Sequence, residues 1–154
     1  MVASRKAAAL KPGSIRPGDT LGIVAPASFF VREDFDAGCE ALRGLGYQLV
    51  FEESIFDRDL YFAGSAERRA RELEAMFARQ DVNAILCARG GYGTNYLLPL
   101  LDIKTIAANP KAFVGYSDIT SLMTYLNDAA GLVTFHGPMI AKDFARQDGV
   151  ERGS

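Results

Sequence analysis

A serine in the segment Gly115-Tyr116-Ser117-Asp118 could act as a nucleophile, because a strand is expected to end there and a helix to begin. On such a tight turn the hydroxyl projects above the edge of the sheet, and N–H groups at the start of the helix can stabilise an oxyanion. Serine is also a preferred N-cap of helices, so capping alone is the competing interpretation of Ser117. The GxSxG turn of α/β-hydrolases is incomplete here, since Ile119 replaces its last glycine.

A glycine-rich loop, Arg89-Gly90-Gly91-Tyr92-Gly93-Thr94, follows another expected strand. Its three glycines allow backbone N–H groups to point at a bound anion without interference from side chains. The loop matches neither the dinucleotide fingerprint nor the P-loop, so it is either a backbone anion site or a tight turn. A serine that faces a cluster of glycine N–H groups is the arrangement that acyl transfer requires.

The single histidine, His136, lies in Thr134-Phe135-His136-Gly137-Pro138, just beyond the last expected strand. A serine nucleophile needs a base, and no other imidazole is present. A histidine beside a Gly-Pro turn can equally serve to order the loop by hydrogen bonding. No Ser-x-x-Lys follows Ser117, so the sequence does not indicate a lysine base.

Composition excludes several classes of protein. The 154 residues are 49% hydrophobic and 23% charged, which predicts one globular domain with a true core. A net charge of −2 leaves no basic surplus for nucleic acid, and no apolar run approaches the ~18 residues of a membrane span. The cysteines, Cys39 and Cys87, have neither zinc-site nor scaffold spacing and are expected to be buried thiols in a reducing, cytoplasmic compartment. We therefore expect no metal and no disulfide.

Apolar segments that predict strands alternate with segments that predict helices. The expected strands are 20–25, 47–51, 82–88, 112–116 and 132–135, and the expected helical segments are 32–44, 65–79, 94–107 and 118–128. This alternation predicts an α/β fold with a parallel sheet of about five strands flanked by helices, a layered domain of the Rossmann or flavodoxin type. Ligands bind beyond the carboxyl ends of such strands, where both motifs lie. We expect residues 1–14 to be a flexible or vector-derived lead-in, 15–144 the domain that bears the nucleophile, and 145–154 a polar tail.

Four blocks, in this order, resemble the LD-carboxypeptidase family, which includes the microcin self-immunity peptidases. The blocks are Arg16-Pro-Gly-Asp-Thr-Leu-Gly-Ile-Val-Ala-Pro-Ala-Ser28, Ala88-Arg-Gly-Gly-Tyr-Gly-Thr94, Val114-Gly-Tyr-Ser-Asp-Ile-Thr120 and Thr134-Phe-His-Gly-Pro-Met139. The resemblance runs from about residue 15 to residue 144. Agreement of four blocks in order is far more specific than any one of them.

The resemblance implies a role for each matching residue. Ser117 would be the nucleophile, the backbone amides of Gly91 and Asp118 would form the oxyanion hole, and Arg89, Gly90 and Tyr92 would border the substrate cleft. No metal or cofactor is implied. Family members cleave the bond between an L-centre and a terminal D-alanine in murein tetrapeptides, in the cytoplasm during cell-wall recycling. Immunity members instead cleave a peptidyl-nucleotide antibiotic.

The family pattern extends beyond this chain. Members are about twice as long, and a second, C-terminal domain supplies the glutamate and histidine of the triad. The resemblance therefore implies a half that bears the nucleophile, is inactive or very weak alone, and exposes an apolar face that could form a homodimer. The block around His136 belongs to the first domain, so this histidine is not the family's base.

Two other classes of function remain open from the residues alone. One is a catalytically silent α/β module that binds a peptide carboxylate or a phosphate at the glycine loop. The other is a flavodoxin-like signalling module, which is disfavoured because the third strand ends in Ala88-Arg89 rather than in an acidic phospho-acceptor.

Overall fold

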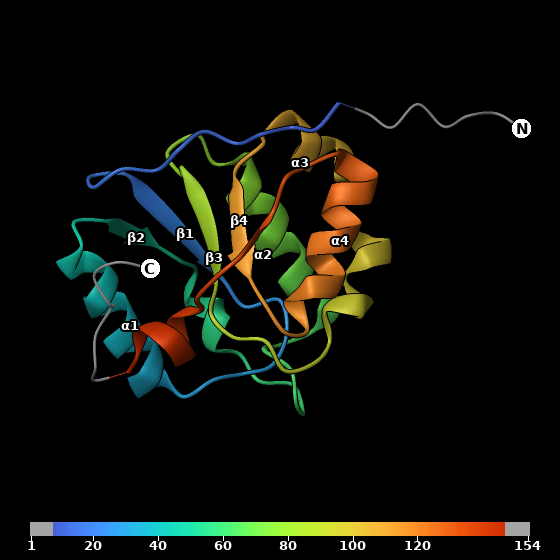
Figure 1. Cartoon of the computed structure of the whole chain (residues 1–154). Coiled ribbons are helices and arrows are strands. Elements are labelled where there is room, and N and C mark those ends of the chain that lie inside the picture. The colour runs from blue at the N-terminus through green and yellow to red at the C-terminus, as the bar shows by residue number, and fades with distance from the viewer. Residues whose placement is uncertain (1–7, 147–154) are drawn as a thin grey trace, which may run out of the picture.

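The computed structural model describes residues 8–146 and contains a five-stranded sheet whose strands are all parallel, in the order β2-β1-β3-β4-β5 (Figure 1). This confirms the predicted sheet. The strands are β1 (Thr20–Val24), β2 (Gln48–Val50), β3 (Ala84–Cys87), β4 (Ala112–Gly115) and β5 (Phe135–His136). Strands β3 and β4, which precede the two candidate motifs, are neighbours in the sheet.

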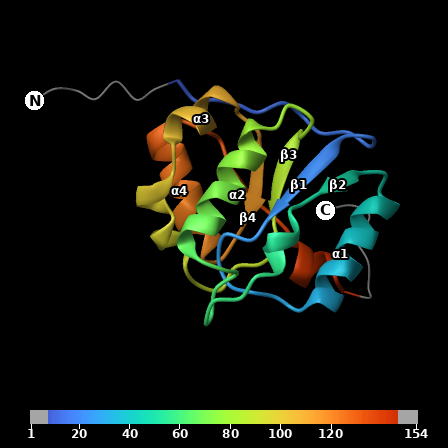
Figure 2. The same ribbon diagram turned by 180° about the vertical axis from the view of Figure 1, so that it is seen from behind.

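The helices cover both faces of this sheet (Figures 1 and 2). One face is covered by α2, α3 and α4, and the other by α1 together with the short helices η1 and η4. Their bounds are α1 (Arg32–Gly44), η1 (Glu53–Phe56), α2 (Ala66–Ala78), η2 (Thr94–Tyr96), η3 (Leu98–Leu100), α3 (Ile103–Ala108), α4 (Ile119–Ala130) and η4 (Ile140–Phe144). No helix within residues 8–146 is long and apolar enough to span a membrane.

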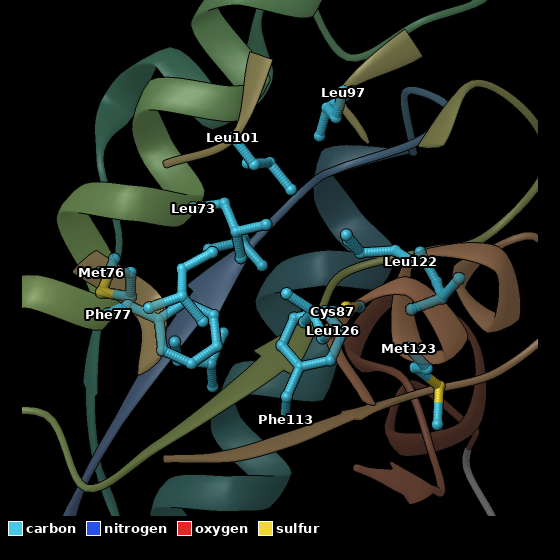
Figure 3. Close-up of a cluster of buried hydrophobic side chains, with 14 of the residues drawn as sticks. Leu73, Met76, Phe77, Cys87, Leu97, Leu101, Phe113, Leu122, Met123 and Leu126 are labelled. Atoms are coloured by element: carbon cyan, nitrogen blue, oxygen red, sulfur yellow. The ribbon is translucent and has the colours of Figure 1, made fainter. Parts of the chain in front are cut away.

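Alternate residues of the strands point to opposite faces and so build two cores. In β1, Ile23 belongs to the core beneath α1 and Val24 to the core beneath α2. In β3, Leu86 lies on the α1 side and Cys87 on the α2 side. Figure 3 shows the larger core, in which Leu73 and Phe77 of α2, Cys87 and Phe113 of the sheet and Leu122 and Leu126 of α4 converge. Each buried Leu or Phe contributes about 1.5–3 kcal/mol, so the two cores hold the strand ends that carry the motifs.

The single helical stretch expected over 94–107 is in fact three short helices, η2, η3 and α3. Pro99 lies inside η3, and the extended backbone of Leu101 (ψ 130°) separates η3 from α3. The side chain of Asp102 then starts α3 afresh, because it accepts a 3.0 Å hydrogen bond from the N–H of Lys104.

The last expected strand, 132–135, is shifted along the chain, since β5 is Phe135–His136 and Leu132 lies outside it. Leu132 instead forms an isolated parallel bridge with Leu10, which is fixed by hydrogen bonds from Leu10 N to Gly131 O (2.8 Å) and from Val133 N to Leu10 O (3.0 Å). Leu10 belongs to the segment expected to be a lead-in. Residues 1–7 of that segment, and residues 147–154 of the expected tail, lie outside the described residues.

After β5 the chain crosses the sheet to reach α1 (orange to red in Figure 1). Ala141 N donates to Ala88 O at 3.0 Å, and Ile140 and Ala141 are buried against α1. The segment 137–144 thus runs past the carboxyl end of β3, beside the edge at which the motifs lie.

Candidate active site

Ser117 lies on the turn between β4 and α4 in a left-handed backbone conformation, with φ +61°. The helix begins at Ile119 with Asp118 in the N-cap position, so the interpretation of Ser117 as an N-cap is wrong. The turn is closed by a 3.0 Å hydrogen bond from Thr120 N to Ser117 O. A left-handed conformation costs an L-residue about 1–2 kcal/mol, and such strain is concentrated at functional sites. It leaves the side chain of Ser117 exposed at the edge of the sheet.

The glycine loop lies directly against this serine. A Cβ added to the buried Gly90 would be 3.0 Å from Ser117 Cβ and 3.3 Å from Ser117 Oγ, so any side chain at this position would crowd the serine. Pairing of β3 with β4 brings the segments together, since each motif begins where its strand ends. The two motifs predicted to share one edge of the sheet are therefore in contact.

The side chain of Asp118 joins the nucleophile turn to the glycine loop. Its Oδ2 accepts a hydrogen bond from Thr94 N (2.9 Å), and the Thr94 hydroxyl lies 2.8 Å from Asp118 O and 3.0 Å from Oδ2. Thr94 is fully buried. The resemblance implied a role for the backbone of Asp118 alone; the partner of its side chain lies 24 residues away and could not be inferred from the motif.

The two backbone amides expected to form the oxyanion hole have no internal partner. Within residues 8–146, neither Gly91 N–H nor Asp118 N–H donates a hydrogen bond to another group of the chain. Further along the glycine loop, by contrast, Tyr92 N donates to Ser28 Oγ and Thr94 N donates to Asp118 Oδ2. An N–H without an acceptor beside a serine hydroxyl is able to stabilise an oxyanion.

Ser28, in the segment that follows β1, supports the glycine loop, a role that the sequence motifs did not reveal. It is buried (2% exposed), its Oγ accepts from Tyr92 N at 3.0 Å and its N–H donates to Gly90 O at 3.2 Å. Gly91 (φ +107°) passes so close that an added Cβ would overlap Ser28 Oγ and lie 2.8 Å from Ser28 Cβ. The available signal was its position just after β1, at the same edge of the sheet as the motifs.

The remaining residues expected at the cleft lie around the loop. Arg89 is exposed and donates to Phe29 O at 3.2 Å. Tyr92 is half exposed, and its hydroxyl lies 3.5 Å from that of Tyr96, a hydrogen bond that raises the pKa of Tyr92. These side chains are available to a ligand at this edge.

His136 is exposed at the end of β5, where its ring centroid lies 5.5 Å from that of Tyr116. The Tyr116 hydroxyl donates to Asp143 Oδ1 at 3.1 Å, and Met139 N donates to Oδ2 of the same carboxylate at 2.9 Å. In the described part of the chain no imidazole or carboxylate is hydrogen-bonded to Ser117 Oγ. Nor do residues 8–146 contain a group of three or more His, Cys, Asp or Glu side chains that could hold a metal ion.

Residues 21–137, which include Ser28, the glycine loop, the Ser117 turn and His136, match the family model of the LD-carboxypeptidase N-terminal domain. The chain belongs to the LD-carboxypeptidase family. The resemblance predicted from four sequence blocks is thus confirmed, and the blocks correspond to β1, the glycine loop, the nucleophile turn and β5.

Several members of the LD-carboxypeptidase family are similar in sequence. The chain is 40% identical over 138 residues to a probable murein peptide carboxypeptidase of Bacillus subtilis, a match that covers 90% of this chain and 43% of the relative. It is 37% identical over 130 residues to the microcin C7 self-immunity protein MccF of Escherichia coli, covering 82% and 38%. The chain therefore spans less than half the length of these relatives.

Solved structures of LD-carboxypeptidase relatives share the fold. An MccF-like protein from Bacillus anthracis superposes with a TM-score of 0.88 at 33% identity, over 93% of this chain and 44% of that one. A muramoyltetrapeptide carboxypeptidase from Oxalobacter formigenes gives a TM-score of 0.79 at 33% identity, over 86% and 44%.

Proposed function

We propose that this domain bears the nucleophile of a serine LD-carboxypeptidase that removes the terminal D-alanine from murein tetrapeptides. The observation that carries the proposal is the left-handed Ser117 in contact with Gly90, beside the free N–H groups of Gly91 and Asp118. Relatives named as murein peptide carboxypeptidases support the substrate class. The free thiols of Cys39 and Cys87 support a cytoplasmic location, where thiols stay reduced.

In the proposed reaction Ser117 Oγ attacks the carbonyl carbon of the L,D bond while a base takes the hydroxyl proton. The carbonyl oxygen becomes an oxyanion that accepts hydrogen bonds from Gly91 N–H and Asp118 N–H. Collapse of the intermediate breaks the C–N bond, and the proton passes to the amine of the departing D-alanine. Water then hydrolyses the acyl-enzyme and restores the serine. Removal of one oxyanion donor costs typically ~10²–10³ in kcat.

The substrate carboxylate and the base complete this proposal. The exposed guanidinium of Arg89 suits a peptide carboxylate, and Gly90 and Tyr92 border the same position. Since no described residue is bonded to Ser117 Oγ as a base, we assign the base to the second domain that the family pattern implies. The isolated chain is then inactive or very weak, because a serine hydroxyl without a base stays protonated.

The first test is release of D-alanine from an L,D-tetrapeptide, followed by mass spectrometry. It compares the chain alone with a chimera in which this chain replaces the matched 138-residue segment of the Bacillus subtilis relative. We expect turnover by the chimera that Ser117→Ala lowers by about a thousandfold or more. Ser121→Ala, one turn into α4, is the matched control and should leave turnover unchanged. A folded chimera whose turnover survives Ser117→Ala would contradict the proposal.

A silent binding module is the second candidate, favoured by the lack of a base bonded to Ser117 in the described residues. Titration of the same peptide into the isolated chain would then show binding without turnover, with Ser117→Ala nearly unaffected. The activity assay is repeated with an aminoacyl sulfamoyl nucleoside, the kind of compound that MccF binds. Preferential cleavage of that compound by the chimera would favour an immunity-type substrate over murein peptides.

A further inference from the structure

Arg69 is the largest fully buried side chain of the described residues, with 1% of its surface exposed. Its guanidinium donates hydrogen bonds to the main-chain oxygens of three separate segments: Pro26 (2.8 Å), Gly93 (3.0 Å) and Gly64 (3.1 Å). It also lies over the ring of Phe62, 4.9 Å from the centroid. No carboxylate of residues 8–146 lies within ion-pair distance of this cation.

A single peptide group lies between this buried cation and Asp118. The peptide that joins Gly93 to Thr94 accepts from Arg69 Nη1 through its C=O and donates to Asp118 Oδ2 through its N–H, at 2.9 Å. Both bonds involve a charged partner; the bond from Arg69 is buried and the bond to Asp118 is partly buried. Charge-assisted hydrogen bonds that are shielded from water are stronger and polarise one another. The positive field of Arg69 and the negative field of Asp118 thus act on the two ends of the same dipole.

We propose that Arg69 and Asp118 form an ion pair bridged by the Gly93–Thr94 peptide, and that Arg69 is a positioning residue for the nucleophile site. The bridge begins two residues after Gly91 and ends on the residue after Ser117, so it fixes the separation of the two oxyanion N–H groups. Its catalytic consequence rests on the proposed function; its existence does not.

The geometry explains why an arginine is buried at this position. A planar guanidinium can donate in several fixed directions, which a lysine ammonium on a flexible stem cannot reproduce across three segments. Burial lowers the pKa of Arg69 and the nearby Asp118 opposes that shift. A cation behind the glycine loop also stabilises negative charge that develops in front of the loop. A side chain that only filled space at this position would not need hydrogen-bond donors in these fixed directions.

The test measures the bridge itself by NMR, without reference to activity. In labelled chain, the exchange rate of the Thr94 amide and the scalar coupling across the hydrogen bond from Thr94 N to the Asp118 carboxyl carbon are recorded. We expect Arg69→Met to accelerate Thr94 exchange about tenfold or more and to weaken the coupling, since an adjacent charged hydrogen bond is lost. Arg69→Lys, the variant that keeps the charge, should give an intermediate rate and serves if Arg69→Met does not fold.

Two comparisons separate positioning from packing. Arg69→Met combined with Asp118→Asn should accelerate Thr94 exchange no more than the larger single effect, because each change breaks the same bridge. Arg71→Met, on the exposed side of α2, is the matched control and should leave Thr94 exchange unchanged. Additive effects, or unchanged Thr94 exchange and coupling in a folded Arg69→Met chain, would overturn the proposal.

The catalytic consequence is tested in the active chimera. Arg69→Met should lower kcat by tenfold or more while KM changes little, since the bridge positions the groups that act in the transition state. A rise in KM by the same factor as the fall in kcat would overturn the positioning role. If the chimera shows no serine-dependent turnover while the Thr94 measurements behave as expected, the proposed function fails and the bridge stands.

Discussion

At the residue scale, the site depends on backbone conformations that suit one residue type. Ser117 occupies the left-handed region at φ +61°, although a serine is strained there. Gly91, at φ +107°, passes so near Ser28 that no side chain fits. The chemistry of the site therefore requires strain at Ser117 and the absence of a side chain at Gly91.

The strain at Ser117 can be measured by comparing glycine with alanine at that position. We expect Ser117→Gly to be more stable than Ser117→Ala by about 1 kcal/mol, because only glycine adopts a positive φ without strain. At Ser121, inside α4, the order should reverse by about 1 kcal/mol in favour of alanine. The measurement is the free energy of unfolding in urea. The same order at both positions would show that Ser117 is not strained in solution.

The close approach of Gly91 to Ser28 leads to a second prediction. Gly91→Ala should lower the free energy of unfolding by about 2 kcal/mol or more, because the new Cβ overlaps Ser28 and the backbone angle is unfavourable. Gly44→Ala is the matched control: its added Cβ would meet no atom within 4 Å at the end of α1, and it should be neutral or stabilising. Equal effects of the two substitutions would contradict the geometry of the loop.

At the element scale, α2 holds the end of β1 through an ion pair as well as through its apolar face. Glu72, with 2% of its side chain exposed, accepts from Arg68 Nη1 at 2.8 Å and from Ala25 N at 3.0 Å. Burial raises the pKa of Glu72, although Arg68 and the Ala25 amide lower it. The helix thereby fixes the backbone just before Ser28, and Arg69 on the same helix fixes the glycine loop.

Removal of Arg68 should therefore have a pH-dependent cost. Arg68→Met leaves the Glu72 carboxylate buried without its cation, which should lower stability by about 3 kcal/mol at pH 7. A carboxyl whose pKa is raised on folding contributes stability that is fully present below the unfolded pKa and is lost as pH rises through the folded value. The stability deficit of the variant should shrink as the pH falls toward 4.5, the ordinary pKa of a glutamate. Urea unfolding across this range is the measurement.

The control for this prediction is Arg71→Met, which removes an exposed charge from the same helix. Its effect should stay within about 0.5 kcal/mol at every pH, as is usual for surface substitutions. A deficit of Arg68→Met that does not vary with pH would contradict the assignment to Glu72.

The elements could be predicted from the sequence more completely than the contacts of the site. Apolar periodicity and the glycine breaks predicted the parallel sheet and three of the four expected helices, α1, α2 and α4, because those signals are local. The interruption at Leu101 and the shift of β5 to Phe135–His136 depend on short-range backbone choices that periodicity does not resolve. The side-chain roles of Asp118 and Arg69 could not be predicted from the sequence. The bonds from Arg69 to Gly93 and from Thr94 to Asp118 each join residues 24 positions apart, and the bond from Arg69 to Pro26 joins residues 43 positions apart. Such contacts form only in the folded chain.

At the scale of the whole molecule, apolar side chains lie exposed beside the candidate site. Leu60 is 91% exposed at φ +53°, and Tyr61, Tyr92 and Tyr96 are each about half exposed. We call these four residues the apolar rim. The rings of Tyr92 and Tyr96 both pack on Phe62, so the rim is continuous with the glycine loop. Contiguous apolar surface of this kind promotes association, and a strained, exposed leucine is unusual where nothing covers it.

We therefore expect the isolated chain to self-associate through the apolar rim as the protein concentration rises. Leu60→Lys should shift the chain toward the monomer in sedimentation velocity, because a charge at the rim opposes burial of this surface. Leu45→Lys is the matched control: Leu45 is 44% exposed after α1, just before β2 begins and thus at the opposite edge of the sheet, and its substitution should leave association unchanged. A monomer at every concentration would show that the rim does not drive association. Association that Leu45→Lys abolishes and Leu60→Lys does not would assign the contact to the opposite edge, leaving the edge that bears Ser117 open to substrate.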